Sequence, residues 1–418
     1  MENTETKTVA IIGGGPAGLI AAEKLSAAGI AVTVFDRMPS VGRKFLMAGR
    51  GGLNLTHSEK PKYFLPRYST SAEKLEPMLR AFSPKAVREW AEGLGQTTFV
   101  GSSGRVFPNA MKASPLLRAW LQRLDAQGVK IRTRMHWQGW DESGALVFQT
   151  EDGAVETFNP DATLLALGGV SWPRLGGDVS WSKILRDAGA GEIVPFTPSN
   201  SGARVEWSPH FAERFAGSPL KNAAFSCGGQ RVKGEAILTA YGIEGGAIYA
   251  LSGAIRDQLY EHEGIATVDI DLRPDQTYEQ IRDRLAAPRN GKTLTTFLRQ
   301  AIRLGPAAIN LLIEIAGEDR AVFADPHLLT ARIKCAPLRV TGLQGLERAI
   351  SSAGGLSWKS VDKRLMLHAK RDVFAAGEML DWDAPTGGYL LQACLSSGVW
   401  AAKSIQKRLS AQPDDDSE

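Results

Sequence analysis

Three glycines near the beginning of the sequence have the spacing of a phosphate-binding turn. Gly13, Gly15 and Gly18 form a G-x-G-x-x-G string, with Pro16 and Ala17 between the second and third glycines. In such a turn the first glycine permits the tight bend, the second lets the backbone approach a pyrophosphate, and the third lets a helix pack closely on a strand. The phosphate charge then lies at the positive end of the helix dipole. The spacing therefore predicts that these five residues bind a dinucleotide.

The residues around the glycine string predict the strands and the helix that it needs. Residues 8–12 are mostly apolar, residues 19–28 favour a helix that stops at Gly29, and residues 30–35 are again apolar and β-branched. A strand, a turn, a helix and a second strand within about 30 residues form a βαβ unit of a parallel sheet. The alternative is a glycine turn in an unrelated α/β protein.

An acidic residue occupies the position where a ribose would be recognised. Asp36 ends the second predicted strand, 18 residues after Gly18. A carboxylate there accepts hydrogen bonds from ribose hydroxyls and repels a 2′-phosphate. We expect Arg37 and Met38, which follow Asp36, to line the same nucleotide.

A basic, glycine-rich stretch, residues 42–56, offers a second group of binding residues. Its glycines permit close approach of the backbone, and its amides can form a nest for an anion. Arg43 and Lys44 can neutralise phosphate charge, and Asn54 and Thr56 can hydrogen-bond the edge of a ring or of a substrate. The candidate contacts in this stretch are Arg43, Lys44, Gly49, Asn54, Leu55 and Thr56. A flexible basic surface loop is the alternative interpretation.

Two later strands also end in glycine. The apolar residues 162–167 lead into Gly168, and we expect Leu167 and Gly168 to pass close to the dinucleotide, unless this is a plain strand-to-loop transition. The strand at residues 373–376 leads into Gly377 and Glu378.

A glycine pair follows and opens the last predicted helix. We expect Gly388 and Tyr389 to face the ligand, because the first amides of a helix can donate to a carbonyl or a pyrophosphate. A helix cap without a ligand is the alternative. Matching glycine segments near both ends predict one discontinuous binding domain with insertions.

The middle of the chain predicts the insertions. Short strands alternate with turns between residues 195 and 250, whereas residues 278–285, 293–304 and 306–315 look helical. Before the insertions, residues 84–94 and 114–127 predict amphipathic helices, the second with Ser114 as its N-cap, and residues 140–158 predict an antiparallel hairpin.

The composition excludes several classes of protein. Hydrophobic residues make up 43% and charged residues 22% of the 418 residues, which is ordinary for a globular protein of two or three domains. The net charge of +4 does not indicate a dedicated nucleic-acid binder, although RNA stays open as a partner. Cys227, Cys335 and Cys394 form no C-x-x-C pair, so we expect no disulfide framework and no metal.

No apolar run reaches the ~18 residues that a membrane span needs. The polar beginning lacks the apolar core of a signal peptide. We therefore expect a cytoplasmic protein without a membrane contact, and the sequence indicates no oligomeric state.

Four stretches together resemble a known family. They are residues 11–18, residues 42–56, the G-R-V-F-P string at 104–108, and residues 374–398 with their A-G-E-x-L-D and T-G-G-Y strings. The chain resembles the YhiN/BaiN-like (aminoacetone-oxidase-type) FAD-binding flavoproteins of the two-dinucleotide-binding class. One departure concerns the loop: many members carry a cysteine where this chain has Leu53, so no role of that thiol can be transferred.

The resemblance implies an α/β fold and FAD as the cofactor. The fold would combine a split Rossmann-like FAD-binding domain with a β-barrel-like insert and a small helical domain. The ranges we predict are 1–194 and 341–418 for the FAD-binding domain, 195–255 and 319–340 for the barrel-like insert, and 256–318 for the helical insert.

The leading functional hypothesis is an FAD-dependent oxidoreductase acting on a small or medium organic substrate, by C=C reduction or amine oxidation. Arg105, Trp172 and Tyr389 are the candidates for the substrate walls, with ordinary packing as the alternative for each. A second G-x-G-x-x-G is missing after any predicted strand, so NAD(P)H would dock only transiently as the reductant.

Two other functions stay open. One is an RNA-modifying flavoenzyme that reduces uridine in ribosomal RNA to dihydrouridine, as a branch of the resembled family does. The basic residues 359–371 would then contact phosphates, or else form a solvated face. The other is a non-enzymatic FAD-binding redox sensor.

Overall fold

The computed structural model describes residues 6–49 and 51–410 and divides into two compact units. The terminal unit joins the residues up to Thr197 with those from Ser352 onward, and the insert unit is Pro198–Ser351. The predicted boundaries lay at 194/195 and 340/341. The chain leaves the terminal unit three residues later than this and returns to it eleven residues later. Arg50 of the predicted basic loop and the acidic tail lie outside the described residues.

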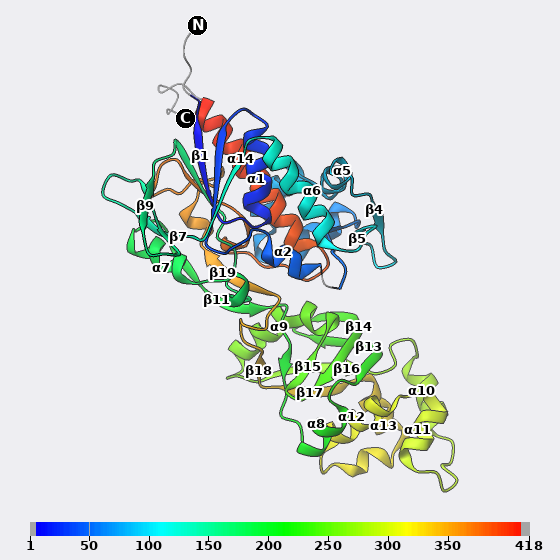
Figure 1. Cartoon of the computed structure of the whole chain (residues 1–418). Helices are drawn as coiled ribbons and strands as arrows, with labels where there is room; N and C mark the ends of the chain where they lie inside the picture. Colours follow the sequence, from blue (N-terminus) through cyan, green and yellow to red (C-terminus); the bar gives the residue numbers. More distant parts are fainter. Residues whose placement is uncertain (1–5, 50, 411–418) are drawn as a thin grey trace. The chain divides into compact units, whose positions relative to one another are not determined.

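A five-stranded parallel sheet forms the centre of the terminal unit (Figure 1). Its order is β20-β10-β1-β2-β6. The strands are β1 (Thr8–Ile12), β2 (Ala31–Asp36), β6 (Lys130–Thr133), β10 (Ala162–Leu165) and β20 (Val373–Ala375). The fold is thus a Rossmann-type mixed α/β domain, as predicted. Strand β1 lies between β2 and β10, so the strand order reverses direction at β1. A ligand crevice is expected at the carboxyl ends of the strands at such a point.

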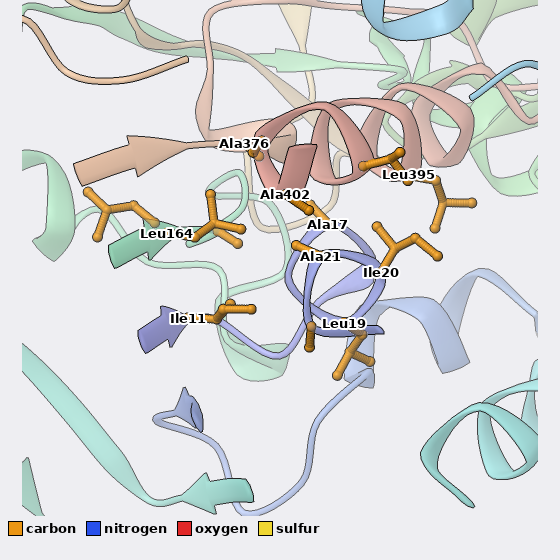
Figure 2. Packing of buried hydrophobic residues seen from close by; sticks show 14 of the residues in the cluster. Ile11, Ala17, Leu19, Ile20, Ala21, Leu164, Ala376, Leu395 and Ala402 are labelled. Carbon is orange, nitrogen blue, oxygen red and sulfur yellow. The ribbon is translucent and has the colours of Figure 1, made fainter. Parts of the chain in front are cut away.

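Two helices from opposite ends of the chain pack directly on each other. They are α1 (Pro16–Ser26) and α14 (Tyr389–Ser410). Figure 2 shows small and branched apolar residues of both helices facing one another, including Ala17 and Ala402. A Cβ added to Gly398 would lie 2.3 Å from the carbonyl oxygen of Ala17, so the close approach of the helices needs a glycine there. This contact joins the two halves of the discontinuous domain.

Smaller elements surround this core. One antiparallel sheet has the order β3-β5-β4, a second has the order β7-β8-β9, and β11 pairs with β19 where the chain crosses between the units. The strands are β3 (Thr56–His57), β4 (Thr98–Val100), β5 (Arg105–Pro108), β7 (Met135–Trp140), β8 (Leu146–Thr150), β9 (Val155–Phe158), β11 (Ile193–Ser199) and β19 (Ser351–Leu356). The helices are α2 (Arg43–Ala48), α3 (Pro61–Phe64), α4 (Ala72–Ala81), α5 (Pro84–Gly93), α6 (Ala113–Ala126) and α7 (Ser180–Asp187).

The insert unit combines one antiparallel sheet with a group of helices. The sheet has the order β17-β16-β13-β14-β15-β12-β18, with β17 and β18 at its ends. The strands are β12 (Ala203–Arg204), β13 (Pro219–Cys227), β14 (Gln230–Thr239), β15 (Gly242–Glu244), β16 (Ala266–Asp271), β17 (Ala336–Val340) and β18 (Gly342–Leu343). The helices are α8 (Pro209–Phe215), α9 (Gly246–Glu261), α10 (Tyr278–Leu285), α11 (Leu294–Ile302), α12 (Pro306–Ala316) and α13 (Pro326–Lys334).

Three local predictions differ from the structure. Helix α6 begins at Ala113 with Lys112 as its N-cap, so Ser114 lies inside the first turn because the helix starts earlier. The segment 256–318 is not wholly helical, since β16 pairs there with β13 and β17 in the sheet. Helix α13 falls in the segment 319–340, where we expected only the return of the barrel. Short strands and helices of similar apolarity differ mainly in their long-range partners, which a local pattern does not show.

Candidate active site

The carboxyl ends of adjacent parallel strands bring the predicted binding segments to one edge of the sheet. The glycine string follows β1, Asp36 ends β2, and Gly377 follows β20. Leu167 and Gly168 follow β10, and both are half-buried. The register aligns Ile12 with Phe35 on one side and with Leu165 on the other, so these segments leave the sheet at the same level. The tertiary fold therefore assembles in one place what the sequence distributes over both ends.

The three glycines of the string differ in what surrounds them. A Cβ on Gly13 would lie 2.1 Å from the Ala166 carbonyl oxygen, and a Cβ on Gly18 would lie 2.0 Å from the Gly13 carbonyl oxygen. Gly15, the N-cap of α1, has no atom within 4 Å of such a Cβ. The first and third glycines thus serve the packing of the turn, whereas the second faces open space at the N-terminus of a helix, where an anion is favoured.

Asp36 is fixed by the turn that it faces. Its carboxylate accepts hydrogen bonds from the backbone amides of Gly14 and Met38, both at 2.8 Å. Burial raises the pKa of Asp36 above its ordinary value, although both amide bonds oppose this shift. A further hydrogen-bond donor, such as a ribose hydroxyl, would therefore stabilise the charged form.

Three buried polar atoms of the predicted binding residues have no hydrogen-bond partner among the described residues. They are Nε of Arg37, Nε of Arg43 and Oδ1 of Asn54. Buried polar atoms of native proteins usually have partners, so these three need a ligand or water. Other atoms of the two arginines are engaged: Arg37 Nη1 donates to Asp178 at 2.6 Å, and Arg43 Nη1 makes a long contact with Ser40.

Lys44 and Glu378 link three segments of the site. Lys44 Nζ donates to the Gly169 carbonyl oxygen at 2.7 Å and lies 3.9 Å from Glu378 Oε2. The Glu378 carboxylate also accepts from the amides of Gly169 and Ser352, at 3.3 and 3.2 Å. Both side chains were predicted to contact the cofactor, and the structure occupies them with protein partners. Their evident effect is to hold the loops after β10 and β20 together.

Thr56 and Gly388 meet where the basic loop reaches the beginning of α14. A Cβ on Gly388 would lie 2.5 Å from Thr56 Cα, and the φ of Gly388 is 94°, so this position requires glycine. The Thr56 hydroxyl, predicted to reach a ring or substrate, instead donates to the fully buried Gln392 at 2.6 Å. Leu53 and Leu55 are fully buried, so Leu53 fills core space at the position of the family cysteine.

Tyr389 belongs to a polar and aromatic cluster that the sequence did not reveal. Its hydroxyl donates to Glu59 at 2.6 Å, and Arg67 donates to both oxygens of the same carboxylate at 3.1 Å. The ring stacks on His57 at 5.4 Å, with the Glu59 amide donating to His57 Nδ1. Phe64 and Tyr68 close the other sides of the ring. Glu59 and Arg67 lie over 300 residues from Tyr389, and no spacing in the sequence signals their contact.

The proposed substrate walls are only partly together. Arg105 lies on β5, paired with His57 of β3, and its Nε approaches the Gly387 position beside Tyr389. Trp172 lies on a different loop, after β10, in a left-handed conformation with a φ of 54°. Arg105 is therefore half-buried beside the segment of the buried Tyr389, and Trp172 flanks the loop of Gly168.

The remaining predicted contacts hold the backbone of the site. Pro16 and Ala17 begin α1, and the Met38 carbonyl accepts from the Arg134 amide at 3.2 Å. Gly49 packs against Ala113, which a Cβ would approach to 2.6 Å.

Replacing Glu59 with glutamine is expected to lower the free energy of unfolding by about 1 kcal/mol at neutral pH, since it weakens charged hydrogen bonds. Burial favours a higher pKa for Glu59, but bonds from Arg67 and Tyr389 outweigh it and hold the pKa below its ordinary value. A depressed folded pKa contributes stability above the unfolded pKa of about 4.3, and this is lost as the pH falls through the folded pKa. Urea unfolding at pH 7 and pH 3.5 measures the difference. An equal gap at both pH values would contradict this account.

The described residues set limits on other chemistry. Among them, no group of three or more His, Cys, Asp or Glu side chains is placed to hold a metal ion. In the same part of the chain, every helix is too short or too polar to cross a bilayer.

The open Gly15 turn, Asp36 and the unpartnered atoms of Arg37, Arg43 and Asn54 suit the groups of FAD. The Gly15 turn and the two arginines suit a pyrophosphate, and the Asp36 carboxylate suits a ribose. An imide N–H of the flavin ring would satisfy the Asn54 acceptor. The residues present therefore fit this dinucleotide.

Known proteins are similar to this chain in sequence and in fold. The profile of the HI0933-like protein Rossmann domain matches residues 7–404. Ribosomal RNA dihydrouridine synthase of Haemophilus influenzae is 25% identical over 419 residues, which cover 95% of this chain and 98% of that protein.

Two solved structures are similar in fold. A flavocytochrome c3 fumarate reductase has a TM-score of 0.53 at 16% identity, covering 98% of this chain and 80% of that chain. The 3-ketosteroid delta1-dehydrogenase of Sterolibacterium denitrificans has a TM-score of 0.52 at 13% identity, covering 96% of this chain and all (100%) of that chain. The terminal unit thus has the Rossmann FAD-binding fold of flavoenzymes.

Proposed function

The chain belongs to the HI0933-like Rossmann family, and from this premise we propose that it is an FAD-dependent reductase of uridine in ribosomal RNA. The fold of FAD-dependent oxidoreductases supports the redox class. The end-to-end similarity to the Haemophilus influenzae ribosomal RNA dihydrouridine synthase supports the substrate. Because that match includes the insert unit as well as the FAD-binding fold, it argues for a shared substrate more than a match of the Rossmann part alone would.

The terminal unit holds the cofactor in this proposal. The Gly15 turn and the arginines at positions 37 and 43 receive the pyrophosphate, and Asp36 receives the ribose. Asn54 accepts a hydrogen bond from the ring system through its unpartnered Oδ1. When bound, FAD supplies two-electron transfer between a nicotinamide and the base.

The reaction reduces one carbon–carbon double bond. Uridine gains two electrons and two hydrogens across its C5=C6 bond, one as hydride and one as a proton. NAD(P)H is oxidised to NAD(P)+ and supplies the hydride, and solvent supplies the proton. Arg105 and the Tyr389 segment form the wall against which we expect the base to lie, because they adjoin the predicted ring-binding loop.

Product analysis tests the proposal. The purified protein should carry a flavin absorption spectrum and, with NADPH or NADH, should convert uridine in an unmodified ribosomal RNA transcript to dihydrouridine, detected by mass spectrometry as a gain of two hydrogens. Stopped-flow measurement of flavin reduction identifies which nicotinamide is used.

The outcomes separate the competing functions. A protein that stays colourless when supplied with FAD would refute the cofactor assignment. A flavin that is reduced and then reoxidised only by small unsaturated compounds or amines would replace RNA by a small-molecule substrate. A reduced flavin that no acceptor reoxidises would favour a redox sensor.

A further inference from the structure

We propose that one surface of the insert unit binds the phosphate backbone of the RNA substrate, an inference that rests on the proposed function. The surface is formed by residues 282–303, which are the second half of α10, the loop after it, α11 and its C-cap Arg303, and is called the basic surface here. Its cations are Arg282, Arg284, Arg289, Lys292, Arg299 and Arg303, against one acid, Asp283.

Charge is concentrated on this segment. Six cations and one acid give the 22 residues 282–303 a net charge of +5, while the whole chain carries +4. The rest of the chain is therefore net negative by one. A modest overall charge thus conceals a local positive surface, and local clustering is what attracts a polyanion.

Four of these cations are available to a ligand. Arg284, Lys292, Arg299 and Arg303 are exposed, and none of the ion pairs or hydrogen bonds among the described residues engages their side chains. The other two are occupied, because Arg282 pairs with Asp283 at 2.7 Å and Arg289 donates to the Phe323 carbonyl.

Packing turns the free cations outward. Helices α10 and α11 contact each other and lie next to one another in Figure 1. Their apolar residues, including Ile281 and Leu285 on α10 and Phe297 and Ile302 on α11, are buried. Arg299 lies in the last turn of α11 and Arg303 is its C-cap, so both belong to the C-terminal end of this helix. At 1.5 Å per residue each helix is about 12–14 Å long, so the cations can meet several phosphates of one strand at once.

The surroundings favour a hydrated polyanion over an apolar partner. No large hydrophobic side chain of the segment 282–303 is among the exposed ones of the described chain. Asn290 and Thr295 are exposed and add neutral hydrogen-bond donors of the kind that phosphate oxygens accept. A membrane surface would be expected to meet apolar anchors beside the cations.

In the other basic stretch, residues 359–371, some cations already interact with other side chains of the protein. Lys370 lies over the Trp140 ring at 4.4 Å, and Arg371 lies 3.6 Å from Asp372. We therefore assign the main phosphate contacts to the basic surface, in place of the segment that the sequence suggested.

A triple variant with a charge-matched control tests the assignment. The test variant carries Arg284→Gln, Lys292→Gln and Arg299→Gln. The control carries Arg80→Gln, Lys85→Gln and Lys183→Gln, which removes the same charge from exposed helical positions already paired with i,i+4 acids. Binding of full-length holoenzyme to an unmodified ribosomal RNA transcript is measured by fluorescence anisotropy between 50 and about 200 mM salt.

The salt dependence is the decisive readout. Three lost contacts to single-stranded phosphates should reduce the slope of log K against log salt by about 2 and weaken binding about 10- to 100-fold at low salt. The control should keep the wild-type slope, and FAD content and flavin reduction should be unchanged in both variants. The KM for RNA should rise in the test variant while kcat stays near wild type.

Each other outcome has a clear meaning. If the test variant keeps the wild-type slope and affinity, the basic surface is not the phosphate site, while dihydrouridine formation by the wild type would leave the proposed function intact. If the wild type neither binds the transcript nor modifies it, both proposals fall. Tighter binding to phosphatidylglycerol vesicles than to the transcript would overturn the RNA assignment in favour of a membrane surface.

Discussion

An Asp36→Ala variant should lose FAD at least about tenfold more readily than the wild type, and up to about 100-fold, as judged by equilibrium dialysis followed by absorption of the retained flavin. The reason is the loss of charged hydrogen bonds to the ribose, worth about 1.5–3 kcal/mol. The same change also frees the amides of Gly14 and Met38, which Asp36 holds at 2.8 Å. Part of the effect would therefore come from a less ordered glycine turn.

Asp161 provides a matched control. It accepts hydrogen bonds from the amide and hydroxyl of Thr8, both at 2.8 Å, at the opposite end of β1. Asp161→Ala thus removes a similar carboxylate from the same sheet, away from the ligand edge. It should lower stability and leave FAD affinity unchanged. Equal FAD retention in Asp36→Ala and Asp161→Ala would show that Asp36 does not bind the ribose.

The pH dependence has a defined direction. Burial raises the pKa of Asp36, and a bound ribose would favour its charged form. Cofactor binding should therefore release a proton when the pH lies near the Asp36 pKa of the empty protein. FAD affinity should fall as the pH drops through that value, whereas the Asp36→Ala variant should lose this part of the pH dependence.

Gly15→Ala should separate FAD binding from stability. The added Cβ meets no protein atom within 4 Å, and the φ of Gly15 is −85°, so the protein without FAD should unfold within about 1 kcal/mol of the wild type. The same methyl group would occupy the space through which the pyrophosphate approaches. Overpacking of this kind costs about 1–3 kcal/mol, so FAD affinity should fall by about 5- to 150-fold.

Gly305 offers a close structural match for the control. It is also the N-cap of a helix, precedes a proline, has a φ of −75° and leaves open space for a Cβ. Gly305→Ala should change stability as little as Gly15→Ala and leave FAD affinity unaltered. In contrast, Gly18→Ala should lower both, because its Cβ would lie 2.0 Å from the Gly13 carbonyl oxygen. Wild-type FAD affinity in Gly15→Ala would show that no phosphate lies at this turn.

Local patterns predicted the nucleotide-binding unit well. The strand, turn and helix around Gly15 and the acid at Asp36 lie within 29 residues, from Thr8 to Asp36, and β1 pairs with β2 inside that segment. Helix α10 was also predicted with its observed bounds, and in the structure a capping box of Thr277 and Gln280 marks its beginning. In both places the determining interactions join residues that are close together in the sequence.

Side-chain partners were harder to predict. Thr56 and Asn54 looked equally suited to a ligand, yet the Thr56 hydroxyl is taken by Gln392, 336 residues away, and Asn54 keeps an unpartnered oxygen. Lys44 and Glu378 looked like two independent ligands, and the fold places them on each other and on Gly169. Whether a polar side chain binds the protein or a ligand depends on contacts between residues far apart in the sequence, and residue spacing does not predict these contacts.

By itself, then, the sequence determined the glycine turn, the acidic strand end, the split binding domain and the family, because each depends on residues near one another or on whole strings of residues. Only the tertiary structure decided that Glu59 and Arg67 hold Tyr389, and that Arg284, Lys292, Arg299 and Arg303 of the basic surface are exposed. The physical reason is that chain folding, not chain order, sets which charges are paired, buried or left facing water.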